Sequence, residues 1–222
     1  DIGKVWEAAA RPSSYTVAFS NHRNELWLLN VNTSRFELIE KNAHDRLTDL
    51  TWAPNAHYLA YNAHLDQSRS GIKVYDFKTK KSRYLFNPVL HDFSPSFDPS
   101  GEYLFFLGVR EFRPVYNETH FDLGFPQATG AYMVSLKKEG QNPLDWAYCM
   151  KKEAPKESKN KKEKRPKDFD IDYENIDQRV FSLPVELGGY HRIAACKERV
   201  FLLRSSEVGK REDTDLYCFQ FE

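Results

Sequence analysis

The sequence has little of what several protein classes depend on. Its 222 residues contain only three cysteines, Cys149, Cys196 and Cys218. They are too few and too widely spaced for a disulfide framework or a zinc site. No apolar run approaches the roughly 18 residues that a membrane-spanning helix needs. Alanine-rich helical runs are nearly absent. These absences argue against a disulfide-rich secreted domain, a zinc protein and a helical membrane protein.

A net charge of either sign is also lacking. Lysine plus arginine and aspartate plus glutamate both number 32, so the formal charge is zero. A neutral chain has no general electrostatic reason to bind nucleic acid or an anionic membrane, and we expect neither as a partner. Unpaired thiols fit a reducing compartment, so we expect a cytoplasmic location.

The common catalytic and phosphate-binding motifs are missing. The sequence has no G-x-S-x-G, no P-loop and no G-x-G-x-x-G, and no His-x-x-x-His pair offers metal-ligand spacing. We therefore assign no catalytic, cofactor-binding or metal-binding residue, and we expect no cofactor.

Histidines with an acidic neighbour are the remaining candidates for chemistry. A carboxylate can orient an imidazole for base catalysis, but such pairs are also frequent in loops between strands. Ser94 and Ser96 follow one of the pairs, yet neighbouring residues on a strand point to opposite faces, so no triad is predicted. We interpret all of them as loop chemistry: His44-Asp45, His64 with Asp66, His91-Asp92 and His120 with Asp122.

Aromatic residues, in contrast, are abundant. The chain has 16 Phe, 12 Tyr and 4 Trp. Aromatic side chains pack well on a pleated surface, so this composition favours many short strands over helices. The sequence predicts an all-β protein.

Two segments of the chain repeat at nearly the same period. The stretch from Trp52 to Tyr61 matches Phe97 to Phe106, each reading aromatic, any residue, Pro, three polar or small residues and Tyr-Leu, at an offset of 45 residues. A second stretch beginning at Glu25 matches one beginning at Gly71, at an offset of 46 residues. A period in the mid-forties that holds about four short strands is typical of a β-propeller blade.

The repeat predicts a β-propeller with about four blades of four antiparallel strands. The last blade shows only three strands, and an open sheet edge leaves backbone groups unpaired. We therefore expect a fragment of a larger propeller, with a small closed four-bladed propeller as the alternative. The predicted blades span residues 4–39, 47–86, 93–184 and 190–222.

Two insertions interrupt the third predicted blade. Residues 151–167 contain nine basic and three acidic residues, and we expect them to form a charged, flexible loop. The insertion at 109–130 could contact a peptide or could pack against its own blade, and no binding role is assigned to its arginines and aromatics. These are Arg110, Phe112, Arg113, Tyr116, Phe121 and Phe125.

Two further stretches resemble the tricorn proteases. One is Phe97–Pro126, and the other is Phe169–Tyr190, which is similar to the family pattern I-D-x-x-x-I-x-x-R-V-x-x-L-P-V followed by G-x-Y. A Lys/Glu-rich loop just before that pattern is also a habit of the family. The resemblance extends over essentially the whole chain.

The resemblance implies a larger parent protein. Tricorn proteases carry a six-bladed propeller, a seven-bladed propeller, a helical domain, a PDZ domain and a serine peptidase core, and they assemble as hexamers that degrade oligopeptides. This chain resembles the C-terminal blades of the seven-bladed propeller, which selects and delivers substrate without cleaving it. Two alternatives remain open: a TolB-like propeller acting as an interaction scaffold, and the lid propeller of a prolyl-oligopeptidase-like hydrolase.

Overall fold

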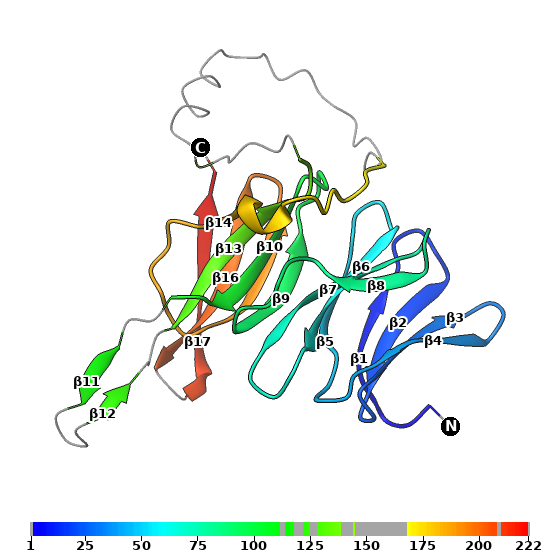
Figure 1. The fold of residues 1–222 in the computed structure, drawn as a ribbon, viewed down its shortest axis with the longest axis horizontal. Coiled ribbons are helices and arrows are strands. Elements are labelled where there is room, and N and C mark those ends of the chain that lie inside the picture. The colour runs from blue at the N-terminus through cyan, green and yellow to red at the C-terminus, as the bar shows by residue number, and fades with distance from the viewer. Residues whose placement is uncertain are drawn as a thin grey trace, which may run out of the picture.

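A computed structural model shows an all-β chain, as the aromatic content and the repeat predict (Figure 1). The only helical element among the described residues is η1, a 3-10 helix at Ile176–Arg179. The predicted charged loop at 151–167 lies outside the described residues. The structure describes residues 2–111, 114–117, 122–124, 128–138, 144, 168–207 and 210–221.

The strands form four blades of antiparallel neighbours, which confirms the predicted propeller architecture. Blade 1 contains β1 (Val5–Ala10), β2 (Thr16–Asn21), β3 (Glu25–Asn30) and β4 (Arg35–Lys41). Blade 2 contains β5 (Thr48–Trp52), β6 (Tyr58–His64), β7 (Ser70–Asp76) and β8 (Lys81–Tyr84). Blade 3 contains β9 (His91–Phe97), β10 (Tyr103–Val109), β13 (Thr129–Ser135) and β14 (Val180–Ser182). Blade 4 contains β15 (Tyr190–Cys196), β16 (Arg199–Glu207) and β17 (Lys210–Gln220).

Blades 2 and 3 touch through their backbones. A single parallel pair, Ser70 with His91, joins β7 to β9, so eight strands share one hydrogen-bonded network. The insertion between β10 and β13 contains a further short hairpin, β11 (Val115–Asn117) and β12 (Asp122–Gly124), which the sequence did not predict as strands.

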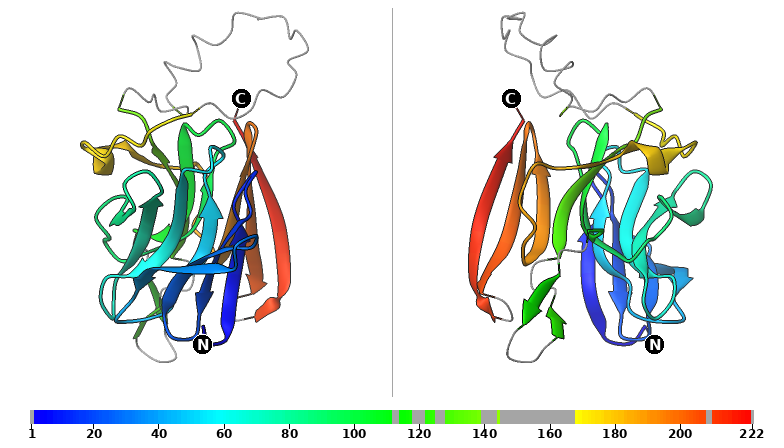
Figure 2. Two further views of the ribbon diagram at one scale, coloured as in Figure 1. Left: turned by 90° about the vertical axis from the view of Figure 1, so that its right-hand side faces the viewer. Right: turned by 60° about the vertical axis from the view of Figure 1, so that its left-hand side comes forward.

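The first strand of each blade lies on the inside of the arc. β1, β5, β9 and β15 follow one another side by side, and each contacts the first strand of the next blade (Figures 1 and 2). The register between first and second strands is interrupted in every blade. In β5 and β9 the interruption contains a residue with left-handed backbone, Asp49 (φ 57°) and Ser94 (φ 51°). These bulges turn side chains of the inner strands toward the next blade.

The core consists of three clusters, one between each pair of neighbouring blades. Strand β6 shows why the central strands read as continuous apolar runs. Its residues Tyr58 and Ala60 belong to the cluster facing blade 3, whereas Leu59 and Tyr61 belong to the cluster facing blade 1. Since successive side chains of a strand point to opposite faces, a strand in the middle of a blade stack must be apolar on both.

A strap at residues 168–179 closes one end of the core between blades 2 and 3. Phe169 packs on Tyr58, with ring centroids 5.8 Å apart, and the Tyr58 hydroxyl donates to Asp170 Oδ1 at 3.1 Å. Gly101 lies below the same ring with φ +74°, and a Cβ there would stand 2.2 Å from Phe169. The strap is therefore fitted to both blades.

Large apolar side chains are exposed in both end blades. In blade 1, Phe36 and Leu38 are 46% and 47% exposed, and in blade 4, Leu216 is 65% exposed. The two middle blades carry far less exposed apolar surface, because each has a neighbour on both faces. The end blades thus present surfaces suited to further sheets.

Candidate functional site

The inner strands carry a series of polar side chains that link each blade to the next. Glu7 on β1 accepts hydrogen bonds from the backbone N–H groups of Asp49, at 2.8 Å, and Leu50, at 2.9 Å. Both carboxylate oxygens of Glu7 are therefore occupied by blade 2.

The same relation recurs in the next two blades. The Asp49 carboxylate accepts the N–H of Ser94 at 2.9 Å, and the Ser94 hydroxyl accepts the N–H of Ile193 at 3.1 Å. A second hydroxyl, that of Ser96, accepts the N–H of Ala195 at 2.9 Å. The bulged, left-handed residues of β5 and β9 occupy equivalent positions, 45 residues apart, and each supplies the acceptor.

Two of these acceptors carry a charge in a partly desolvated place. Burial raises the pKa of the Glu7 carboxyl above its ordinary value, against the hydrogen bond from Leu50. Burial likewise raises the pKa of Asp49, against the hydrogen bond from Ser94. The positive charge of Arg192 on β15 lowers both values, so its guanidinium lies within electrostatic reach of blades 1 and 2.

Arg192 is the residue of this group that is free to meet a ligand. Its side chain is exposed, and no hydrogen bond or ion pair holds it among the described residues. Glu7, Asp49 and Ser94, in contrast, are engaged by backbone N–H groups. The inside of the arc thus offers an exposed cation within electrostatic reach of two carboxylates that are engaged by backbone N–H groups, an arrangement for attracting and orienting charged groups rather than for covalent chemistry.

The histidine–carboxylate pairs suggested by the sequence are arranged differently in space. His64 Nε2 lies 3.8 Å from Asp45 Oδ2 instead of pairing with Asp66, whose carboxylate binds Arg69. His91 Nδ1 lies 3.3 Å from the Ser70 hydroxyl. His120 lies outside the described residues, as do the side chains near it. Among the described pairs, His91 alone lies within hydrogen-bonding distance of a hydroxyl, that of Ser70, which is 4% exposed.

Asp92 forms an ion pair with Arg110 of the insertion. Its carboxylate, 1% exposed, accepts Nε and Nη2 of Arg110 at 2.8 and 2.9 Å. The guanidinium lies over three aromatic rings, those of Phe86, Phe106 and Tyr132, at 4.9 to 5.4 Å from their centroids. Burial raises the pKa of Asp92, and the bond to Arg110 opposes that rise. This cluster fixes the start of the insertion between blades 2 and 3.

The other residues singled out from the sequence are two serines, three cysteines and the side chains of the insertion. Ser94 and Ser96 are the interblade acceptors described above, and within the described residues no hydrogen bond joins either of them to a histidine. Cys196 and Cys218 are free and exposed, and Cys149 lies outside the described residues. Within the described part of the chain, no group of three His, Cys, Asp or Glu side chains could hold a metal ion. Of the six arginines and aromatics singled out in the insertion, Arg110 is the one whose side chain the structure describes.

Sequence analysis missed Glu7, Asp49 and Arg192. A usable signal existed for one of them, because the repeat aligns Asp49 with Ser94. The alignment places a hydrogen-bonding side chain at one point of successive inner strands. Nothing local marks Arg192, since its partners lie in blades 1 and 2.

Comparison with known proteins now identifies the architecture. The profile described as "Tricorn protease second beta propeller domain" matches residues 1–222. The chain belongs to that family. The resemblance seen in the sequence is thereby confirmed.

Individual relatives agree with this assignment. A tricorn protease homolog from Saccharolobus solfataricus is 30% identical over 218 residues, covering 96% of this chain and 19% of the relative. A crystal structure of the tricorn protease superposes with a TM-score of 0.82 at 18% identity, covering the whole chain and 22% of that protein. TolB from Acinetobacter baumannii superposes at 0.60 with 12% identity over 99% of this chain and 41% of that one, a likeness of fold alone.

The chain spans about a fifth of the length of the curated relative it matches. The tricorn proteases it matches are therefore much longer than this chain. Within the described residues, no helix combines the length and apolar character needed to cross a bilayer.

Proposed function

We propose that this chain is a non-catalytic part of the substrate channel of a tricorn-like serine peptidase that degrades oligopeptides. The observation that carries the proposal is the row of inner strands, β1, β5, β9 and β15, with Arg192 exposed on the inside of the arc. Further blades on the apolar end faces would continue this row around an axis. A peptide moving along the axis would then pass the Arg192 guanidinium.

The electrostatics support selection rather than cleavage. Glu7 and Asp49 are tied to backbone N–H groups and hold the blades in place. Arg192 remains available for carboxylates of a passing peptide, to which a guanidinium donates two parallel hydrogen bonds. The remaining parts of the proposal rest on the family relation: the peptidase core in other domains, a homo-oligomeric full-length protein and a cytoplasmic location.

The proposal is tested in the full-length protein with Arg192→Gln and with Lys197→Gln as a matched control on the exposed β15–β16 turn. We expect Arg192→Gln to lower kcat/KM for long, acidic peptides by about fivefold, since a lost charged contact costs roughly 1 kcal/mol. Turnover of a minimal uncharged substrate should not change, and Lys197→Gln should leave both values as they are. An unaltered preference for acidic peptides in Arg192→Gln would contradict the proposal.

The isolated chain provides a second test, because a channel segment contains no peptidase site. Incubation of residues 1–222 with fluorogenic peptides should give no turnover above buffer. Turnover by the purified chain would overturn the non-catalytic assignment.

A second candidate is a scaffold that binds other proteins, as the TolB fold likeness allows. It differs in one measurable respect. A scaffold would retain protein partners when Arg192 is replaced and would show no effect of the propeller on peptide turnover.

A further inference from the structure

A pocket of about 240 Å³ opens between the sheet of blade 4 and the segment that connects blade 3 to blade 4. The last strands of the two blades differ in length. β14 of blade 3 has three residues, whereas β17 of blade 4 has eleven. Around Leu202, Arg204 and Tyr217, the sheet of blade 4 is faced by the connecting segment 183–189 instead of by a strand. That segment fills the space incompletely.

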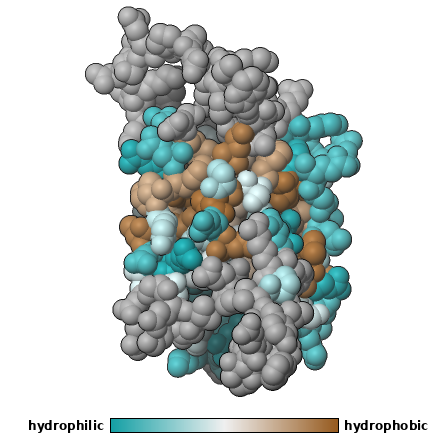
Figure 3. All heavy atoms as spheres, turned by 90° about the vertical axis from the view of Figure 1, so that its left-hand side faces the viewer, coloured by the Kyte–Doolittle hydropathy of each residue, from teal (hydrophilic) through white to brown (hydrophobic). Residues whose placement is uncertain are grey.

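The walls of the pocket are largely apolar. Leu202, 1% exposed, and Phe219 contribute from the sheet, and Val185 contributes from the connecting segment. Figure 3 views the side of the molecule on which β14 and β17 lie and shows hydrophobic residues gathered in the middle of this face, with hydrophilic residues around them. An apolar side chain of a ligand would replace water against these walls.

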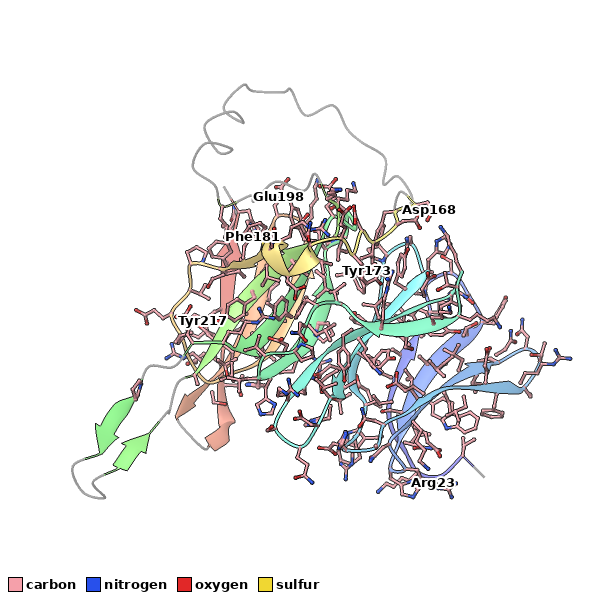
Figure 4. All side chains as sticks on the ribbon, viewed as in Figure 1. Arg23, Asp168, Tyr173, Phe181, Glu198 and Tyr217 are labelled. Carbon is pink, nitrogen blue, oxygen red and sulfur yellow. The ribbon has the colours of Figure 1, made fainter. Side chains whose placement is uncertain are left out.

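One positively charged side chain, that of Arg204, lines the pocket. The Arg204 guanidinium lies 5.8 Å from the ring centroids of both Tyr190 and Tyr217, whose rings meet edge to face. Tyr217 is labelled at the left of Figure 4. The residue next to the guanidinium at position 188 must be glycine, because a Cβ on Gly188 would stand 2.8 Å from Arg204 Nε. Both rings thus lie within cation–π range of the guanidinium.

The N–H groups of the Arg204 guanidinium have no hydrogen-bond partner in the described part of the chain. Among the described residues the side chain also has no ion pair, although Asp215 lies opposite in the register of β16 and β17. Glu186 also lines the pocket, is exposed and has no ion-pair partner among the described residues. A guanidinium has five N–H donors and pairs best with a carboxylate. The pocket thus combines the paired N–H donors of Arg204, the carboxylate of Glu186 and apolar walls. It suits a ligand that has a carboxylate, an N–H donor and an apolar side chain.

We propose that this pocket binds the carboxy-terminal residue of a peptide that ends in an apolar side chain. The terminal carboxylate pairs with Arg204, the apolar side chain lies against Leu202 and Phe219, and the last peptide N–H donates to Glu186. The proposal rests on the proposed function only in taking peptides as the ligands. Because the pocket lies on the face toward blade 3, a further sheet packed on the opposite face of blade 4 would leave it open.

The test is an equilibrium titration of the full-length protein with two tripeptides, Ala-Ala-Phe with a free carboxylate and the same peptide as its amide. The titration is monitored by the Phe ring signals in ligand-observed NMR. We expect the acid to bind at least about tenfold more tightly than the amide, a difference of about 1.4 kcal/mol. Arg204→Gln should abolish that difference, whereas Arg199→Gln, on the same strand and on the opposite face, should preserve it.

Equal binding of acid and amide to the unaltered protein would overturn the proposal. So would an acid preference that survives Arg204→Gln. Should Arg204→Gln disturb the blade, a second measurement decides. A tripeptide with a terminal photo-reactive benzoylphenylalanine should cross-link to peptides from 185–190 or 202–219, and cross-links confined to other regions would refute the site. Arg192→Gln separates this inference from the channel proposal, because it should alter turnover without altering the acid preference.

Discussion

Between blades 2 and 3 the structure ties the sheets together at both ends of the strands. The Asp92–Arg110 pair and its aromatic rings close one end. The strap at 168–179, in which Figure 4 labels Asp168 and Tyr173, closes the other. Between blades 3 and 4 the described contacts are an apolar cluster and a few hydrogen bonds, chiefly those of Ser94 and Ser96, with no ion pair across the seam. The pocket lies in this second seam.

From these contacts we expect the two seams to differ in stiffness. A seam closed by buried charge, aromatic stacking and a strap opens only when several contacts break together. A seam held by an apolar cluster and a few hydrogen bonds can open more readily, and a ligand pocket there costs less stability. The predictions below test this difference by hydrogen exchange and denaturant unfolding of the full-length protein.

The largest effect is expected for Arg110→Ala. It leaves the Asp92 carboxylate buried without a partner, and breaking a buried pair in this way costs about 3–5 kcal/mol. We expect faster exchange in peptides from β9 and β10 and a lower unfolding midpoint. Replacing both partners, as Asp92→Leu with Arg110→Met, should restore most of the stability, because the unpaired charge is then gone. A double variant as unstable as Arg110→Ala would refute this explanation.

The strap should give the next largest effect. Phe169→Ala removes a ring packed on Tyr58 and over Gly101, and such large-to-small changes cost about 3 kcal/mol or more. Exchange should rise in peptides from β6 and from the 97–103 turn, while blade 4 stays unaffected. Phe36→Ala, at an exposed position, is the control and should change stability by less than about 1 kcal/mol. Equal effects of the two variants would mean that the strap does not hold the blades.

A third prediction concerns pH and the seam between blades 1 and 2. The folded pKa of Glu7 is raised, so the folded state binds a proton more tightly than the unfolded state. Stability from this group is greatest at low pH and falls as pH rises from the ordinary carboxyl pKa through the raised one. Glu7→Gln should therefore flatten this dependence. Asp49, whose pKa is also raised, and Arg192 both act electrostatically on the Glu7 carboxyl, so neither residue is substituted in this experiment.

The measurement is the denaturant midpoint of the Glu7→Gln variant against pH between about 4 and 7. A slope identical to that of the unaltered protein would show that Glu7 does not titrate in this window. The matched control is Glu37→Gln, since Glu37 is an exposed partner of Lys80 on blade 1.

Much of this architecture was predictable from the sequence, for a local reason. The apolar runs at 59–61 and 104–107 and the Pro-containing turns repeat with the blade, so strands and turns followed from short-range pattern. The contacts that distinguish the seams were not predictable. Tyr58 and Asp170 are 112 residues apart, and Arg192 acts on Glu7 from three blades away. Neither contact produces a periodic pattern in the sequence, because neither recurs from blade to blade in the described residues.

The smallest predicted effect is that of Ser96→Ala in the weaker seam. The change removes the hydroxyl that accepts the Ala195 N–H and leaves that donor unpaired, which costs about 1 kcal/mol. Position 96 has ordinary strand backbone, so alanine adds no strain there, unlike at the left-handed Ser94. Exchange should rise by about fivefold at β15 and not at β6, whereas Ser182→Ala, at an exposed hydroxyl on β14, should change neither. Because the effect is small, a rise confined to β15 would show that blade 4 opens by itself, and an equal rise in β6 would show instead that the arc opens as one unit.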